Sequence, residues 1–170
     1  MTEITQTTRL TLRHVRLGDA AFIVTLVNDS DWLRFIGDKS VSSIEDAERY
    51  LETGPLAMYA QHGFGLFAVA LRDTDAPIGL CGLLQRDGLE HPDLGFAFLP
   101  EYRRHGFATE AAKATLIYAQ LVHGLTHVDA ITLPENKKSI ALLRRLKFAY
   151  QQDIQLPGDS DIVQRYTVEL

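Results

Sequence analysis

The chain has 170 residues, of which 46% are hydrophobic, so it can bury the core of one ordinary domain without disulfides or metal ions as cross-links. Its 17 basic and 22 acidic residues give a formal net charge of −5, which argues against a surface built for nucleic acid, and its single cysteine excludes an intramolecular disulfide framework. No apolar run approaches the roughly 20 residues of a membrane-spanning helix, and the polar start MTEITQTTRL lacks the features of a signal peptide. We therefore expect a cytoplasmic protein, without a membrane partner, in which residues 1–170 form one domain.

The first half of the chain predicts short strands and helices in alternation. Leu10 and Leu12 alternate with polar residues, as in a half-buried strand. Ser43 and Asp46 form a weaker variant of the capping box before an apolar periodic run. The predicted elements are a strand at Arg9–Val15, a helix from Gly18 to about Asn28, a short aromatic segment at Asp31–Asp38, a helix starting near Ile44, and strands at Gly65–Leu71, Pro77–Gln85 and His91–Pro100.

The second half predicts two helices separated by a strand, and then a hairpin. The elements are a helix from about Phe107 to Val122, a strand at His127–Leu133, a basic amphipathic helix at Glu135–Leu146, and strands at Phe148–Leu156 and Ile162–Val168. A meander followed by a strand–helix–strand crossover predicts an α/β (α+β) fold: a mixed, mostly antiparallel sheet with one central parallel pair, flanked by helices.

The segment FLPEYRRHGFATEAAKA (98–114) carries the strongest chemical signal. A short basic loop, RRHG, joins the end of a strand to the helix that starts about Phe107. Such a loop can turn successive backbone N–H groups toward one point, beside the positive end of the helix dipole. Gly106 permits a positive φ and a close approach of a ligand, while Arg103 and Arg104 add charged donors. The pattern indicates a site for a phosphate-like anion, although taken alone it also fits a solvated strand–helix turn.

Three other kinds of site are excluded by position. No Gly-Lys-Ser/Thr follows the loop, so it is not a nucleoside-triphosphate loop. The letters GFGLFA (63–68) match the dinucleotide fingerprint, but they precede a strand, whereas the fingerprint must follow one. His123 and His127 are four residues apart, but Gly124 breaks the helix between them, so we expect no metal site.

At these residues the chain resembles a known family. RRHGFA (103–108) is similar to the [R/Q]-x-x-G-x-[G/A] pyrophosphate loop of the GNAT N-acetyltransferases, and TEA (109–111) fits its continuation. DLGFAFL (93–99) resembles that family's fourth strand, and LPENKKS (133–139) with RLKF (145–148) resembles its N-x-x-S…L-G-F segment. The opening RLTLR (9–13), followed by ND (28–29) and FIG (35–37), resembles the RimJ/RimL-like branch, which contains ribosomal-protein N-terminal acetyltransferases. The similarity covers nearly the whole chain, in order.

Two positions depart from the family pattern. Lys147 replaces the glycine before Phe148, so the preceding helix must end without the residue that most easily adopts a left-handed conformation. Leu143 stands where many members carry a tyrosine that protonates the leaving thiolate, and leucine cannot donate a proton. In this branch the resemblance gives that role to Ser139, near the sulfur.

The resemblance implies acetyl-CoA as co-substrate, a primary amine as acceptor, direct transfer in one ternary complex, and no metal. The strand edge would bind the pantetheine amides, the loop would bind the pyrophosphate, and Asn136 would hydrogen-bond the pantetheine arm. The implied donor-binding residues are Phe96, Phe98, Leu99, Arg103, Arg104, His105, Gly106, Phe107, Ala108, Thr109 and Asn136.

A general base is needed as well, because an amine attacks only as the free base. Asp93 at the start of the strand is the first candidate, Glu90 the second and His91 the third, since histidine titrates near neutral pH. Each of the three equally fits a polar turn exposed to water.

The acceptor side has weaker signals. Trp32, Arg34 and Phe35 follow the first helix, where the family builds its acceptor pocket, with His91 as a further candidate contact; a packing cluster is the alternative for the first three. The last helix has a basic face that is either a solvated surface or a contact for the 3′-phosphate of CoA, formed by Lys137, Lys138, Arg144, Arg145 and Lys147.

The sequence supports two functional hypotheses. The first is an acetyl-CoA-dependent N-acetyltransferase acting on a protein N-terminus or a small amine, with no nucleic-acid partner, as a monomer or homodimer. The second is a non-catalytic acyl-CoA-binding or regulatory module on the same fold, which Leu143 motivates.

Overall fold

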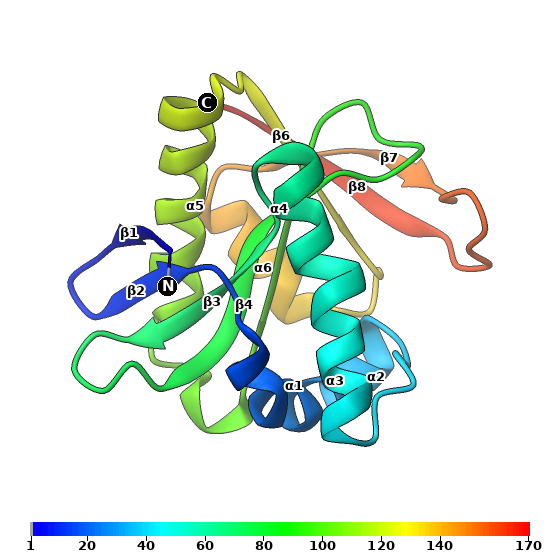
Figure 1. Cartoon of the computed structure of the whole chain (residues 1–170). Helices are drawn as coiled ribbons and strands as arrows, with labels where there is room; N and C mark the ends of the chain where they lie inside the picture. Colours follow the sequence, from blue (N-terminus) through cyan, green and yellow to red (C-terminus); the bar gives the residue numbers. More distant parts are fainter. Residues whose placement is uncertain (1) are drawn as a thin grey trace.

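The strands Leu66–Leu71 (β3) and Pro77–Leu84 (β4) are apolar along their length, because both faces of this part of the sheet are covered. In the computed structural model, the described residues, 2–170, form an eight-stranded sheet in the order β1-β2-β3-β4-β5-β6-β8-β7 (Figure 1). The other strands are Glu3–Gln6 (β1), Leu10–Arg13 (β2), Asp93–Phe98 (β5), His127–Thr132 (β6), Ala149–Ile154 (β7) and Val163–Glu169 (β8). Only β5 and β6, of the paired strands in residues 2–170, run parallel, as the sequence predicts.

Helices cover both faces of the sheet (Figure 1). Phe107–His123 (α5) and Lys137–Arg145 (α6) share one hydrophobic core with Phe67 and Val69. The opposite core joins Ala68 to helices that form the other layer, which are Ala20–Val27 (α1), Ser30–Phe35 (α2), Ile44–Leu51 (α3) and Ala57–His62 (α4). The alternation of β3 side chains between the two cores is the period-2 pattern of a strand buried on both faces.

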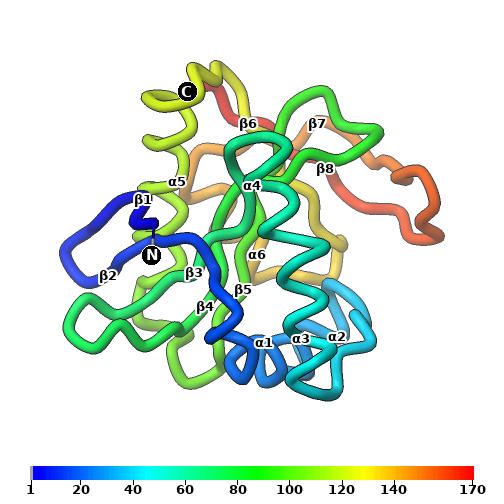
Figure 2. Tube along the Cα trace, viewed as in Figure 1, coloured from blue at the N-terminus to red at the C-terminus, as the bar shows by residue number. Residues whose placement is uncertain are grey.

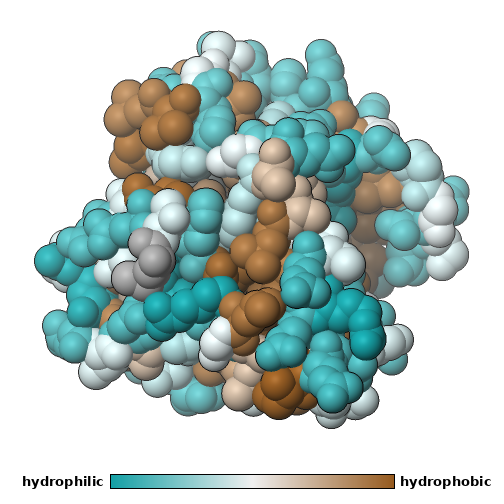
Figure 3. Space-filling model, viewed as in Figure 1, coloured by the Kyte–Doolittle hydropathy of each residue, from teal (hydrophilic) through white to brown (hydrophobic). Residues whose placement is uncertain are grey.

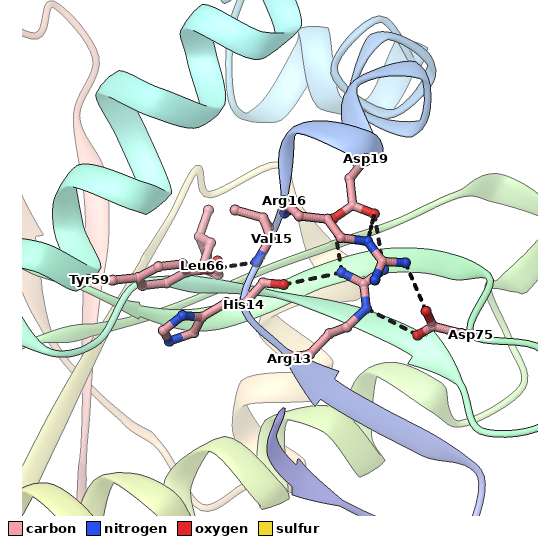
Figure 4. Close-up of polar contacts among 8 residues, drawn as sticks. All are labelled: Arg13, His14, Val15, Arg16, Asp19, Tyr59, Leu66 and Asp75. Carbon is pink, nitrogen blue, oxygen red and sulfur yellow. Dashed lines mark hydrogen bonds and ion pairs between the residues drawn. The ribbon is translucent and has the colours of Figure 1, made fainter. Parts of the chain in front are cut away.

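A buried ion pair joins the end of β2 to its neighbours (Figure 4). Arg13 is fully buried, and its guanidinium donates to both carboxylate oxygens of Asp19 at 2.9 and 3.0 Å and to Asp75 at 3.1 Å. Asp19 belongs to the short 3₁₀ turn Leu17–Asp19 (η1), and Asp75 to the β3–β4 turn. Burying this cation is tolerated because its donors are matched to two carboxylates.

The first and last strands of the described chain are far apart in the sheet: β1 is at one edge, and β8 lies next to β7 at the other edge (Figure 2). The C-terminus is beside the α5–β6 turn, where the Leu170 N–H donates to the Thr126 carbonyl at 2.8 Å. Figure 3 shows hydrophobic residues gathered near the end of α5, where Leu121 is 76% and Val122 63% exposed. Across residues 2–170, no helix combines the length and apolar character needed to cross a membrane.

Sequence and structure differ in four places. The edge strand β1 was not predicted, because EITQ is short and polar. The predicted helix from Gly18 is split into η1 and α1, and the aromatic segment is the helix α2, with Asp29 as its cap. The helix starting at Ile44 is capped by Ser43 as predicted, but it continues through a π-helical turn, Glu52–Leu56 (η2), into α4.

Candidate functional site

The parallel strands β5 and β6 meet at one point and then diverge. Their register contains a single pair, Asp93 with Asp129, where the Asp129 N–H donates to the Pro92 carbonyl at 2.9 Å. By contrast, β4 and β5 pair at six positions. Beyond Asp93, one edge of β5 therefore has no strand partner, and an extended molecule can hydrogen-bond to it.

Alternation identifies the backbone groups that face this opening. The Leu99 N–H donates to Ile78 on β4 at 2.9 Å, whereas the Pro92 carbonyl points to β6, so even-numbered residues of β5 direct their backbone groups into the opening. The Phe98 carbonyl accepts from Nε of Arg103 at 3.1 Å. Of the predicted donor-binding residues on β5, Phe96 therefore has its N–H and C=O directed into the opening, whereas the Leu99 N–H is used within the sheet.

The basic loop follows β5 after a short 3₁₀ turn, Pro100–Tyr102 (η3). Arg104 and Gly106 have positive φ angles of 65° and 79°. These two left-handed residues turn the backbone so that, in the described part of the chain, the N–H groups of residues 104 to 109 have no hydrogen-bond acceptor. Residues 104–106 precede α5, a helix of 17 residues, and residues 107–109 are its first turn. A run of free N–H groups at the positive end of a long helix is a binding site for an anion.

Arg9 and Glu110 hold this loop from one side. The Arg9 guanidinium donates to Glu110 Oε2 at 2.8 Å and to the His105 carbonyl at 2.9 Å, and it lies 4.2 Å from the centre of the Phe107 ring. Glu110 also accepts from the Thr7 hydroxyl at 2.5 Å. Burial opposes ionisation of Glu110, but these hydrogen bonds and the Arg9 charge outweigh it and lower the pKa of this carboxyl.

Arg103 holds the loop from the other side. Its guanidinium donates to Asp29 at 2.5 Å and to Asp31 at 3.0 Å. Burial opposes ionisation of Asp29, yet the Arg103 contact and the N–H groups of Trp32 and Asp31 lower its pKa. The sequence predicts that both arginines donate to a ligand. In the structure the Arg103 side chain is engaged with α2, and Arg104 is exposed with no hydrogen bond or ion pair within residues 2–170.

Asn136 and Ser139 begin α6. Oδ1 of Asn136 caps the helix by accepting from the Ser139 N–H at 3.3 Å. The Ser139 side chain is half-buried, and its hydroxyl has no partner among the described residues. Arg145, at the other end of α6, donates to the Thr109 hydroxyl at 3.3 Å. This contact brings the basic face of α6 to the first turn of α5, beside the anion-binding loop.

The two departures from the family pattern have structural consequences. Lys147 adopts a φ of +72°, and the Phe148 N–H donates to the Leu143 carbonyl at 3.0 Å, so the chain forms the left-handed helix ending without glycine. Leu143 is 1% exposed and belongs to the core between α6 and the sheet.

Asp93 lies at the point where β5 and β6 meet and is only 1% exposed. Nε of Arg86 donates to its two oxygens at 3.2 and 3.1 Å. Burial raises the pKa of Asp93 to about 6, with the Arg86 charge opposing and the Asp129 charge adding to the rise. Such a carboxyl can exchange a proton near neutral pH. Of the other candidates, Glu90 is exposed, and His91 stacks on His127 with ring centroids 5.1 Å apart.

The predicted acceptor residues separate into two kinds. Trp32 is 4% exposed and packs in the core with Ile23 and Leu26, which supports the packing alternative for this residue. Arg34 is exposed and lies 4.7 Å from the centre of the Phe35 ring. Because α2 is joined to the basic loop through Arg103, these two side chains are on an element fixed to that loop.

Sequence reasoning missed the side chains that support the site, which are Arg9, Asp29, Asp31, Arg86, Glu110 and Asp129. Only Asp129 had a local signal, as the lone acid within the strand HVDAIT. Arg9, Glu110, Asp29 and Asp31 have partners more than 70 residues away, and Arg86, seven residues before Asp93, lies outside the predicted strands.

An open strand edge that leads to an anion-binding helix terminus, with a buried carboxyl at its closed end, is suited to group transfer from an extended, phosphate-bearing donor. Residues 9–149 match the family described as acetyltransferase (GNAT) domain. The chain therefore belongs to the GNAT acetyltransferase family, and it is an acyltransferase enzyme.

Individual relatives agree with this family. The chain is 30% identical over 156 residues to the uncharacterized N-acetyltransferase YoaA of Bacillus subtilis strain 168, a match that covers 90% of this chain and 85% of that one. The RimL ribosomal L7/L12 α-N-protein acetyltransferase, solved in complex with coenzyme A, superposes with a TM-score of 0.80 at 16% identity, covering 99% and 98% of the two chains. A Salmonella typhimurium acetyl transferase, described as modifying the N-terminal serine of ribosomal protein L7/L12, gives a TM-score of 0.82 at 14% identity over 99% of each chain. At these identities, the solved structures show that the chain has the same fold as RimL, and they show the fold alone.

Proposed function

We propose that the protein is an N-acetyltransferase, formed by residues 1–170 as one domain in the cytoplasm, that transfers an acetyl group from acetyl-CoA directly to a primary amine. The observation that carries this proposal is the run of free N–H groups at residues 104–109, next to the open edge of β5 at Phe96. A phosphate-rich donor with an amide-containing arm matches both features, because the helix terminus binds the anion and the strand edge binds the amides.

Each part of the donor has a matching set of residues. The N–H groups of residues 104–109 would bind the pyrophosphate, with Arg104 adding charge. Phe96 would pair with the pantetheine amides, and Nδ2 of Asn136 would donate to the same arm, since its Oδ1 already caps α6. Arg145 and the neighbouring basic residues of α6 would face the 3′-phosphate. When bound, acetyl-CoA supplies a thioester whose carbonyl carbon is open to attack by an amine.

The protein's own groups would move two protons. Asp93 takes the proton that the amine loses, through a bound water molecule, because the carboxyl is only 1% exposed. A backbone N–H of the β5 edge polarises the acetyl carbonyl. A C–N bond forms, the C–S bond breaks, and the Ser139 hydroxyl gives its proton to the departing thiolate; Asp93 then releases the amine proton to water and Ser139 regains one from it. Glu90 and His91 are the alternative bases.

The acceptor is a protein N-terminus or a small amine. The formal net charge of −5 favours the approach of a cationic amine. Arg34 and Phe35 lie on α2, which Arg103 joins to the donor loop, and would contact this acceptor. A solved neighbour described as acting on the N-terminal serine of a ribosomal protein supports the first class.

Calorimetric titration with CoA tests the donor site. Gly106→Glu places a negative side chain among the free N–H groups and should abolish measurable binding. Gly158→Glu is the matched control: Gly158 also has a positive φ, +83°, with open space around it, but lies in the β7–β8 turn. Binding to the wild type and the control, but not to Gly106→Glu, is the expected result. No binding to the wild type, or equal binding to all three proteins, would contradict the proposal.

A second candidate function is a CoA-binding module without turnover, because the buried Leu143 cannot donate a proton. Release of free thiol with a panel of amines and N-terminal peptides separates the two. If CoA binds and no amine supports thiol release, the module is the correct function. If thiol is released, Ser139→Ala should slow the release, because no other hydroxyl begins α6.

A further inference from the structure

A second buried carboxyl lies beside Asp93. Asp129 is fully buried, and it forms the single register pair of the parallel junction with Asp93. Val128 and Ala130 face the core beneath α5 and α6, as does Leu94 on β5. By alternation, both aspartates therefore project from the opposite face of the sheet, on neighbouring strands at the same level.

Only one of the two carboxylate oxygens of Asp129 has a hydrogen-bond donor among the described residues. Its Oδ1 accepts from the Thr167 hydroxyl at 2.6 Å and lies 3.6 Å from Nη1 of Arg165. Its Oδ2 is buried with no hydrogen-bond partner among the described residues. A buried carboxylate oxygen without a donor costs stability, and a small apolar residue would avoid that cost. The structure thus retains a negative charge at a place where packing does not need one.

Charged and titratable groups reach this pair from several elements. Arg86, after β4, donates to Asp93, and Tyr50 on α3 lies within the influence of Arg86. Arg165 on β8 is paired with Asp129. The stacked rings of His91 and His127 lie two residues before each aspartate, and Glu169 on β8 is opposite His127 in the register. Arg86 is 41% exposed at its side chain, so solvent weakens its effect on Asp93, whereas Asp129 acts from inside the protein.

We propose that Asp129 is a positioning residue for Asp93: its buried negative charge makes Asp93 a stronger base for the proton of the acceptor amine. The inference rests on the proposed function, in which Asp93 is the base. In the step itself, one proton moves from the amine nitrogen through the bound water molecule to an Asp93 oxygen, and the repulsion between the two carboxylates is relieved when Asp93 becomes neutral. Asp129 gains and loses nothing.

The pH profile of kcat/KM tests this role. Asp129→Asn removes the charge but keeps a side-chain oxygen for the Thr167 hydroxyl. Because a neighbouring negative charge favours the protonated form of Asp93, its removal should move the acid limb of the profile to lower pH, by about one unit. Asp129→Glu restores the charge and should return the limb toward the wild-type position. Asp153→Asn, on the exposed strand β7, is the matched control and should leave the profile unchanged. An acid limb at the same pH in the wild type and Asp129→Asn overturns the proposal.

A second measurement does not need activity. The carboxyl carbon of Asp93 can be titrated by NMR in the free protein, with Asp93→Asn to assign the signal. The midpoint should fall in Asp129→Asn, and an unchanged midpoint overturns the proposal. A lowered midpoint in a protein that acetylates no amine confirms the charge coupling and refutes the proposed function, so the two failures are distinguishable. If Asp129→Asn does not fold, Arg165→Met removes the counter-charge of Asp129 and should raise the Asp93 midpoint; no rise overturns the proposal.

Discussion

The proposed donor loop and the junction of β5 with β6 differ in exposure and in charge: the loop has exposed backbone donors, and the junction has buried carboxyls. The loop at residues 103–109 presents backbone N–H groups to solvent, and ion pairs from Arg9 and Arg103 keep it in place. The junction hides two carboxyls, Asp93 and Asp129, with few compensating donors. In the proposed function, the loop binds CoA through fixed backbone dipoles, which no change of pH removes, whereas catalysis at the junction depends on the protonation of Asp93. Binding of the donor and transfer of the acetyl group should therefore be separable by mutation.

The largest separation is expected from Asp93→Asn. The amide cannot accept the amine proton, so kcat should fall by roughly 10²- to 10⁴-fold. The Kd for CoA should not change, because no part of the loop contacts this side chain. Steady-state thiol release and calorimetry on the same preparation check both values. In the wild type, Asp93 must be ionised to act, so activity should fall as the pH drops through about 6. A kcat within twofold of the wild type would assign the base to Glu90 or His91.

The same contrast explains what the sequence could predict. The loop was predictable because its conformation is encoded locally: Gly106 takes the left-handed conformation, the basic residues precede it, and the apolar period of α5 begins at once. The mixed sheet with one parallel pair was predictable for a similar reason, since strand–helix–strand order dictates it.

The junction was not predictable, because it depends on register between distant segments. Asp93 was singled out as a base, but its burial and its contact with Arg86 follow from the tertiary structure. Asp129 meets Asp93 only because two strands 36 residues apart pair at one position. Arg103 was assigned to the ligand because its partners, Asp29 and Asp31, are more than 70 residues away.

A smaller effect, confined to the donor side, is expected from Glu110→Ala. The change removes the acceptor for the Thr7 hydroxyl, the Arg9 N–H and the Arg9 Nε, so of the hydrogen bonds that join the segment before β2 to the loop, only the one from Arg9 to the His105 carbonyl is kept. We expect the Kd for CoA to rise about 10-fold, which corresponds to about 1.4 kcal/mol. The conservative Glu110→Gln keeps an oxygen acceptor, so its Kd for CoA should lie between those of the wild type and Glu110→Ala. Calorimetry measures the affinities, and a Kd unchanged in Glu110→Ala would show that the loop holds its shape without this contact.

Loss of the exposed ion pair between Arg103 and Asp31 on α2 should affect CoA binding less than Glu110→Ala does. Asp31 is 41% exposed at its side chain, and its pair with Arg103 is backed by the stronger contact to Asp29. Asp31→Asn should raise the Kd for CoA by no more than about threefold, while Asp29→Asn should have a larger effect because it also caps α2. Equal effects of the two substitutions would contradict this ranking.

The smallest effect should come from Lys147, which lies outside both regions. Its φ of +72° costs a residue with a Cβ roughly 1 kcal/mol or more, and glycine would remove that strain. Glycine also gains entropy in the unfolded chain, which offsets part of the benefit. Lys147→Gly should therefore raise the free energy of unfolding by only about 0.5 kcal/mol, measured by urea denaturation, with kcat and the Kd for CoA unchanged. Arg104→Gly relieves the same kind of strain at φ 65° but removes a charge from the donor loop, so it should weaken CoA binding while Lys147→Gly does not. If both variants bind CoA like the wild type, the Arg104 side chain has no part in holding the phosphates, and the backbone N–H groups alone form the site.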